Sequence, residues 1–327
     1  AGGGAMAGSD AGMDEGFEDS ARNDGVELDL QTLNEAQFNT AAAVRAMREH
    51  GYWRCPGPEW EAGWTLRAVS VCEHPEQAEL RRTCTEGAAP VSGLPGRLNE
   101  VKCAAVRVKA TAVAECSALL KGASTRVACL ARISNLVDEP VRRRLEHVEE
   151  AVGLGADEVE VEASRALCQA LDWVELYEEL TALKEAADKA ALVVLLPVAA
   201  LGSLQALYRA TMVALMSGAN FVAPIECPRL TAACPSDGPH PAMGGTSFEC
   251  GLAMLRAIRD YRELSSFSVG FKVLDCKCHH DALLWMMLVK QELAVGWVVP
   301  QLLRLGGEDL LADMQRSIEH QAAEAQC

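Results

Sequence analysis

The residue types best suited to chemistry gather in one short stretch, 276–280 (CKCHH). Thiolates and imidazoles are the ligands that zinc prefers in proteins, so one hypothesis for this stretch is a metal site. Its C-x-C spacing is less typical of zinc sites than paired C-x-x-C, and no second cysteine pair lies at a matching distance. Cys227 and Cys234 could add ligands from a neighbouring loop. Even with these two cysteines, the C-x-C spacing favours the interpretation that the chain binds no metal.

The thirteen cysteines are odd in number and scattered along the chain, without the spacing of a small disulfide-linked scaffold. Disulfides are rare in reducing compartments, where most cysteines are small buried apolar residues. We therefore expect a reducing intracellular compartment, either the cytoplasm or an organelle such as the mitochondrion. The chain starts at Ala1 with neither a signal peptide nor an Arg-rich presequence, which leaves the organelle undecided.

Composition and charge argue against two kinds of partner, nucleic acids and the membrane interior. Half of the 327 residues are hydrophobic, enough to bury an aliphatic core, and the net charge is -16. A strongly acidic field repels phosphate backbones, so we expect no nucleic-acid partner. The longest apolar stretch, Ala190–Leu201, is interrupted by Pro197 and is shorter than the roughly 18 residues that indicate a membrane helix. We therefore expect no membrane span.

Short apolar runs alternate with longer segments of helical periodicity, a pattern typical of repeated βα units and a parallel sheet. Eight runs qualify as strands, which fits one closed (β/α)8 barrel, an α/β fold of about 250 residues. The predicted strands are Leu66–Cys72, Val101–Val108, Arg126–Ala131, Glu158–Val161, Leu192–Val198, Phe221–Ile225, Val269–Leu274 and Leu302–Leu305.

The segments between these strands carry helix signals. Pro140 begins one helix, and Gly153 ends it. Thr246 and Glu249 form a capping-box pattern at the start of another. A last helix is expected at Glu308–His320. One further helix is predicted from an apolar stripe that we assign to the core, formed by Trp173, Leu176, Tyr177, Leu180 and Leu183.

The predicted organisation is one barrel with extensions. Residues 1–24 are rich in Gly, Ala and acidic residues and are expected to form a flexible tail, followed by a helical cap at 25–65. The barrel itself spans 66–320 and contains a long Pro/Gly-rich loop insertion at 227–245, after the sixth strand. Residues 321–327 form a short tail. In a barrel the loops after the strands form the active-site face, so the insertion either covers a ligand site or contacts a partner.

Motifs between Val26 and about His320 indicate a family. They include Val26–Leu30 (VELDL), Val269–Lys272 (VGFK) and Arg304–Gly306 (RLG), and the match is strongest at the second of these. In this collinear order the chain resembles deoxyribose-phosphate aldolases of the eukaryotic type. The resemblance covers nearly the whole chain and implies the same (β/α)8 barrel that the strand count predicts.

The resemblance also implies a mechanism, in which a lysine in an F-x-K-T-S-T-G motif forms a Schiff base with the substrate carbonyl. A second lysine, in V-G-F-K, lowers the pKa of the first, and an aspartate in E-[IV]-D-V helps to move protons. Here the second lysine is Lys272, and Glu160 occupies the aspartate position. The segment matching the nucleophile motif is Phe221–Cys227 (FVAPIEC), which places Ala223 at the Schiff-base position. Alanine cannot form an imine.

The positions that match the family's phosphate-binding loops have changed as well. A Gly-Gly-Ile-Arg cradle corresponds to DCKC at 275–278, and a final Gly-Ala-Ser corresponds to GGE at 306–308. Asp275, Cys276 and Glu308 are therefore read as degraded cradle positions, because bulk and negative charge oppose a phosphate at a helix N-terminus. No substrate-binding residue is predicted, and we do not expect strong binding of a phosphorylated ligand.

Lys272 and Glu160 are then interpreted as remnants of a catalytic site. We expect Lys272 to pair with Glu160 or with another carboxylate inside the barrel mouth, and the alternative is a relocated nucleophile. Glu162 is expected to point towards the helix layer or an end of the sheet.

Two further charges, Arg107 and Lys109, stand where the family is apolar or aromatic. They are expected to neutralise carboxylates near the mouth, and the alternative is a new anionic ligand site. The candidate carboxylates are Glu73, Asp275 and Glu308.

Three functions remain open. The favoured one is a catalytically inactive pseudoenzyme that serves as a structural or accessory subunit of a larger protein assembly, because the core is kept while the mouth is dismantled. The alternative is a divergent class I aldolase or lyase that cleaves a carbon-carbon bond with Lys272 and Glu160. A third is a module that binds a metabolite without converting it. None of these functions is expected to need a cofactor.

Overall fold

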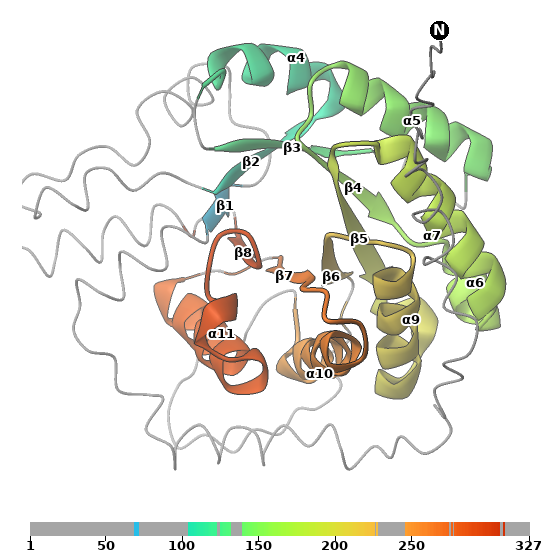
Figure 1. Ribbon diagram of the computed structural model, residues 1–327, viewed down its shortest axis with the longest axis vertical. Helices are drawn as coiled ribbons and strands as arrows, with labels where there is room; N and C mark the ends of the chain where they lie inside the picture. Colours follow the sequence, from blue (N-terminus) through green and yellow to red (C-terminus); the bar gives the residue numbers. More distant parts are fainter. Residues whose placement is uncertain are drawn as a thin grey trace, which may run out of the picture. The chain divides into compact units, whose positions relative to one another are not determined.

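Eight parallel strands of the protein close into one ring. In the computed structural model they pair in sequence order, and the first strand also pairs with the last, so the sheet is a closed barrel (Figure 1). The structure describes residues 69–71, 104–122, 125–131, 139–225, 227, 246–274, 276, 278–307 and 310. The strands are β1 (Val69–Val71), β2 (Ala105–Lys109), β3 (Arg126–Leu130), β4 (Glu158–Glu162), β5 (Ala191–Pro197), β6 (Phe221–Ile225), β7 (Gly270–Val273) and β8 (Leu303–Gly306).

All eight predicted strands are confirmed, and only their ends differ. The sixth matches at both ends, whereas β2 begins at Ala105 rather than Val101. An apolar run can extend past a strand because residues beside the hydrogen-bonded ladder are also buried. Ala104 and Val269, for example, are buried just outside β2 and β7.

Helices connect the strands from β2 to β8 and lie outside the ring (Figure 1). This alternation is the (β/α)8 arrangement that the sequence predicts. The helices are α4 (Ala110–Leu119), α5 (Val141–Gly153), α6 (Arg165–Ala170), α7 (Trp173–Ala187), α8 (Val198–Leu201), α9 (Leu204–Met216), α10 (Phe248–Ser265), α11 (His279–Leu293) and the 3-10 helix η3 (Val295–Trp297).

The predicted ends of α5 are confirmed, but the predicted stripe of α7 is only partly right. Pro140 caps the N-terminus of α5, and the helix ends at Gly153. On α7 the leucines of the stripe are buried, whereas Tyr177 is 40% exposed and Glu179 is buried in its place. A prediction from apolar residues alone misses the buried position of Glu179, because Glu179 is buried as the ion-pair partner of Arg144.

The predicted capping box at the start of α10 is wrong by one residue. Ser247, not Thr246, is the N-cap, and its Oγ accepts a hydrogen bond from the backbone N–H of Cys250 at 3.2 Å. Thr246 instead donates its hydroxyl to the carbonyl oxygen of Leu274 at 2.9 Å. The side chain of Thr246 therefore links the start of α10 to the end of β7.

An aromatic cluster fills the layer between the sheet and the helices. Trp285 of α11 is buried and lies 4.9 Å from Phe248 and 5.9 Å from Phe271, measured between ring centroids. Gly251 makes this packing possible, because a Cβ at that position would lie 2.2 Å from the Trp285 ring. The core of the molecule thus continues outside the barrel under α10 and α11.

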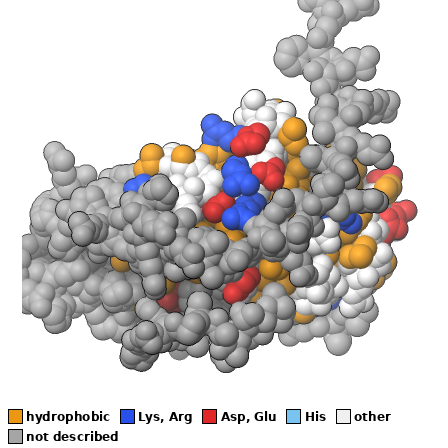
Figure 2. All heavy atoms as spheres, turned by 90° about the horizontal axis from the view of Figure 1, so that it is seen from below, with side chains coloured by type: hydrophobic (Ala, Val, Ile, Leu, Met, Phe, Trp, Pro, Cys, Tyr) orange, Lys and Arg blue, Asp and Glu red, His pale blue; other side chains and the backbone are white. Residues whose placement is uncertain are grey.

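Other parts of the predicted organisation lie outside the described residues. These are the tail at 1–24, the cap at 25–65, the loop at 227–245 apart from Cys227, the helix at Glu308–His320 apart from Leu310, and the tail at 321–327. No helix in the described part of the chain is long and apolar enough to cross a membrane. Acidic and basic side chains lie next to one another on the described part of the face in Figure 2.

Candidate functional site

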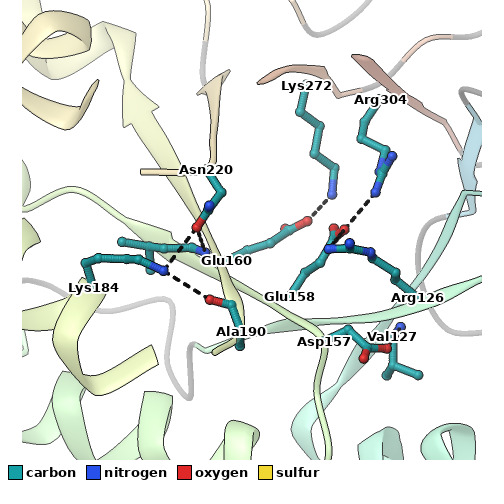
Figure 3. Close-up of polar contacts among 11 residues, drawn as sticks. Arg126, Val127, Asp157, Glu158, Glu160, Lys184, Ala190, Asn220, Lys272 and Arg304 are labelled. Carbon is teal, nitrogen blue, oxygen red and sulfur yellow. Dashed lines mark hydrogen bonds and ion pairs between the residues drawn. The ribbon is translucent and has the colours of Figure 1, made fainter. Parts of the chain in front are cut away.

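The inside of the barrel is charged, and β4 contributes most to this feature. Side chains two residues apart on a strand share a face, so Glu158 and Glu160 both point inward while Val159 and Val161 pack outward against the helices. Lys272 on β7 and Arg304 on β8 reach the two carboxylates from the other side of the ring (Figure 3). Four strands, β2, β4, β7 and β8, supply its buried charges, and Arg126 of β3 approaches from a half-exposed position.

Lys272 and Glu160 form the centre of this site. Lys272 is fully buried, and its Nζ donates a hydrogen bond to Oε1 of Glu160 (Figure 3). Arg107 of β2 donates from Nε to the other oxygen, Oε2, at 2.6 Å. The carboxylate is thus held by two cations, one on each oxygen. The predicted pairing of Lys272 with Glu160 is confirmed.

The charge state of this cluster follows from two opposing effects on Glu160. Burial by itself raises the pKa of the carboxyl, but the adjacent Lys272 and Arg107 outweigh burial and hold the pKa below its usual range. Glu160 is therefore ionised at neutral pH. The Nζ of Lys272 is engaged in the hydrogen bond to this carboxylate. The three side chains form a buried ion-pair cluster that joins β2, β4 and β7.

A second ion pair, which the sequence analysis missed, joins β4 to β8 inside the barrel. Arg304 donates from Nη2 to Oε1 of Glu158 at 2.7 Å, and Arg126 approaches the same oxygen at 3.7 Å (Figure 3). The Arg304 guanidinium also lies over the ring of Phe221, 5.0 Å from its centroid. The alternating EVEVE run of β4 was the signal that could have predicted a charged interior.

Ala223 lies in a very different environment on β6. It is fully buried in an apolar cluster with Val193, Leu195 and Phe221. Gly270 on the neighbouring strand leaves room for the Phe221 ring, since a Cβ there would lie 2.2 Å from it. The partly buried Leu130, Ile225 and Leu274 pack against this apolar cluster.

Glu162 and Arg107 differ from expectation in their details. Glu162 shares the face of Glu160, as the two-residue period requires, but it is the last residue of β4 and its carboxylate contacts Nη2 of Arg165 at 2.6 Å. Its expected place at an end of the sheet is confirmed. Arg107 contacts Glu160, a partner that the sequence analysis did not name.

Several predicted site residues lie beyond the described ranges. Asp275 and Glu308 are among them, as are Glu73 and Cys234. Cys276 is buried, and its thiol donates to the carbonyl oxygen of Cys278 at 3.7 Å. The described residues contain no group of three or more His, Cys, Asp or Glu side chains that could hold a metal. The side chains of the two histidines of the CKCHH stretch lie outside the described residues, so the metal-site hypothesis stays a prediction.

The fold and the buried lysine-carboxylate pair place the chain among α/β-barrel proteins of aldolase type. Bovine deoxyribose-phosphate aldolase is 31% identical over 315 residues, which is 92% of this chain and 95% of the relative. The mouse protein of the same name is 32% identical over 310 residues, or 90% and 93% of the two chains. The chain therefore belongs to the deoxyribose-phosphate aldolase family. No family model matches it.

Solved structures show the same fold at lower identity. A Toxoplasma gondii ME49 protein with the provisional name deoxyribose-phosphate aldolase superposes with a TM-score of 0.62 at 16% identity, covering 82% of this chain and 97% of the other. Deoxyribose phosphate aldolase from Aeropyrum pernix gives a TM-score of 0.52 at 14% identity, covering 84% and 97%. These likenesses confirm the predicted barrel.

Proposed function

We propose that this member of the family no longer performs Schiff-base catalysis and serves as a noncatalytic subunit of a larger protein assembly. The observation that carries the proposal is Ala223, which the family motif aligns with the Schiff-base lysine. Its side chain is fully buried among Val193, Leu195 and Phe221. An imine cannot form at a methyl group.

The state of Lys272 supports the same conclusion. Lys272 is the only lysine that is fully buried in the described part of the barrel, and it is engaged with Glu160. To act as a nucleophile, Lys272 would have to give up its contact with Glu160. Separating the pair would also leave Glu160 with Arg107 alone. The barrel keeps its packing while its interior lysine is paired with a carboxylate, and this combination supports a structural role over catalysis.

The degraded cradle positions add a second, independent argument. Asp275 and Glu308 bring negative charge to the segments that match the family's phosphate-binding loops. The whole chain carries a net charge of -16, so the long-range field also opposes a phosphorylated substrate. A repaired lysine by itself would leave both obstacles in place.

Trapping with borohydride tests the loss of catalysis. The purified chain is incubated with acetaldehyde or 2-deoxyribose 5-phosphate, reduced with sodium borohydride, and mapped by mass spectrometry. We expect no stable adduct on Lys272 and no release of acetaldehyde from the sugar phosphate. The same treatment of the urea-unfolded chain controls for nonspecific labelling of lysines.

An adduct confined to Lys272 in the folded chain would instead favour a divergent class I aldolase or lyase. The burial of Lys272 beside a carboxylate is the observation that keeps this second candidate in view. Lys184 is the matched control, because it is a partly buried lysine on α7 whose Nζ bonds Asn220 and the Ala190 carbonyl (Figure 3). Equal labelling of both lysines would mean that neither is a catalytic nucleophile.

The assembly is tested on the native protein. A tagged copy expressed from its own locus is purified under gentle conditions and analysed by size-exclusion chromatography and quantitative mass spectrometry. We expect elution well above the size of a single chain, with one partner or more at a constant molar ratio through the peak. Elution as a monomer, or as copies of this chain alone, contradicts the role of accessory subunit.

A further inference from the structure

Arg304 has hydrogen-bonding capacity that its ion pair does not use. Its side chain is 3% exposed, and its Nη2 donates to Oε1 of Glu158 at 2.7 Å (Figure 3). The other two guanidinium nitrogens, Nε and Nη1, are buried and have no hydrogen-bond partner in the part of the chain that the structure describes. Every N–H of a guanidinium is a donor, and leaving a buried donor without an acceptor is costly. Arg304 is therefore matched to a ligand that brings an acceptor.

Glu158 has an unused acceptor next to these donors. Its side chain is fully buried, and Oε1 accepts from Arg304, whereas Oε2 is buried without a hydrogen-bond partner among the described residues. The oxygens of a carboxylate are two bonds apart, as are the nitrogens of a guanidinium. Since the two groups are in contact, the unused donors and the unused acceptor lie at one place inside the barrel. A ligand that satisfies both must carry an acceptor and a donor of its own.

The charge at this place is unbalanced. Arg126 approaches Oε1 of Glu158 at 3.7 Å, so among the described residues one carboxylate faces two guanidiniums. Guanidiniums stay charged in proteins, which leaves an excess of one positive charge. The nearby carboxylate of Glu160 does not supply the balance, because its two oxygens already accept from Arg107 and Lys272. The charge that would complete the cluster is that of a monovalent anion.

The neighbours of the cluster define how such an anion reaches it. The ring of Phe221 lies against the face of the Arg304 guanidinium, 5.0 Å from its centroid, so a ligand meets the guanidinium at its edge, where the N–H groups point. Arg126 is the first residue of β3, and its side chain is 49% exposed. It therefore links the buried pair to solvent at the end of the barrel where the strands begin. An ion can enter there without passing the loops that follow the strands.

We propose that Arg304 and Glu158 bind a small monovalent oxyanion that also carries a hydroxyl group, which is the chemistry of hydrogencarbonate. A charged oxygen of the anion accepts from an unused N–H of Arg304, and its hydroxyl donates to Oε2 of Glu158. The site uses neither Lys272 nor position 223, so it is independent of the proposed noncatalytic role. A chain that forms an imine can still bind the anion, and a chain that binds no anion can still be noncatalytic.

Thermal melts in chosen salts test the site. The full chain is melted in sodium hydrogencarbonate, sodium formate or sodium chloride, at one ionic strength and one mildly alkaline pH. An anion that binds only the folded chain stabilises it, so we expect the Tm in hydrogencarbonate to exceed the Tm in chloride by several degrees. Formate has the charge without the hydroxyl and should raise the Tm less. Equal Tm values in hydrogencarbonate and chloride overturn the proposal, and equal effects of formate and hydrogencarbonate overturn the class of ligand.

Variants place the anion at the two side chains. Arg304→Lys keeps the charge but removes the fork of donors, so the selective rise in Tm should be lost. Glu158→Gln removes the carboxylate acceptor, so hydrogencarbonate and formate should become equivalent. Arg142→Lys is the matched control, because Arg142 is a 90% exposed arginine of α5 paired with Glu146 and should respond to the three salts like the wild type. The same response in Arg304→Lys as in the wild type overturns the assignment.

A direct measurement of binding keeps the test decisive if Arg304→Lys folds poorly. Exchange with a bound state broadens the carbon resonance of isotope-labelled hydrogencarbonate, and titration of the folded chain gives the affinity. Arg126→Gln changes a half-exposed position and removes the excess positive charge while Arg304 keeps its donors. We expect its affinity for hydrogencarbonate to be several-fold lower than that of the wild type. Unchanged affinity in Arg126→Gln, or no broadening with the wild type, overturns the proposal.

Discussion

Glu160 is the residue on which the charges of the barrel interior depend. Its two oxygens accept from Lys272 and from Arg107, and all three side chains are largely or wholly buried. Removing one cation still leaves the carboxylate paired, whereas removing the carboxylate leaves two cations facing each other in a region of low dielectric. The loss in the free energy of unfolding should therefore depend strongly on which of the three residues is substituted.

We expect Glu160→Gln to lower the free energy of unfolding by about 3–5 kcal/mol, because it leaves two buried cations without a counter-charge. Lys272→Met should cost less, about 1–3 kcal/mol, because Arg107 still neutralises the carboxylate. Urea unfolding followed by circular dichroism measures both. Glu146→Gln is the control, since it removes only an exposed pair with Arg142 and should cost less than about 1 kcal/mol. Equal losses for the two buried variants would contradict this description of the cluster.

The same carboxylate should make stability depend on acid. The pKa of Glu160 is lowered in the folded state, so its contribution is fully present above the pKa of an unfolded glutamate and is lost as the pH falls through the folded-state value. Unfolding free energies measured between about pH 6 and pH 3 should fall more steeply for the wild type than for Glu160→Gln. Parallel curves would mean that other carboxylates account for the acid sensitivity.

At the scale of the elements, the packing of β6 against β7 depends on a glycine, which has no side chain. Gly270 pairs with Phe221, and a Cβ on Gly270 would lie 2.2 Å from the phenyl ring. The inside of the barrel is filled at this level by the ring and by the Arg304 guanidinium that lies over it. The close approach of Phe221 to Gly270 therefore restricts which residues can stand at both positions, one on each strand.

Gly270→Ala should destabilise the protein by about 1–3 kcal/mol through overpacking. Adding Phe221→Leu makes room for the new methyl group, so the double variant should lose less than the sum of the single losses. Gly296→Ala is the control, because no atom lies within 4 Å of the position of its Cβ. Thermal and urea unfolding of the wild type, the two single variants, the double variant and the control provide the comparison. Additive losses would show that the two positions do not share the space.

The strands could be predicted from the sequence because buried parallel strands are continuous apolar runs. The helix ends were less predictable, since Ser247 and Thr246 are both competent caps and only the contact of Thr246 with Leu274 decides between them. The pairing of Lys272 with Glu160 was predicted through the family resemblance. The pair formed by Glu158 and Arg304 was not, because its members are 146 positions apart in the sequence.

At the scale of the whole molecule, the proposed loss of Schiff-base catalysis should not be reversed by one residue. Ala223→Lys restores the amine but places it in an apolar cluster, and the following segment PIEC lacks the hydroxyls of the family motif. We expect no detectable cleavage of 2-deoxyribose 5-phosphate and a lower Tm than that of the wild type. A coupled assay for acetaldehyde and a thermal melt measure the two effects. Measurable turnover in Ala223→Lys would mean that the rest of the site is intact.

The ion pairs of the interior have a consequence for how the ring is assembled. Glu158 and Glu160 are on β4, in the first half of the barrel, while their partners Arg304 and Lys272 are on β8 and β7. A chain emerging from the ribosome completes the acidic strand more than a hundred residues before either cation exists. Of the described partners, only Arg107 of β2 and Arg126 of β3 are available before β7 and β8 arrive, so each carboxylate is fully paired only when the last strands are in place. Complete pairing of the two carboxylates therefore requires strands from both halves of the barrel, and half-barrel fragments of this chain should associate with the complementary half.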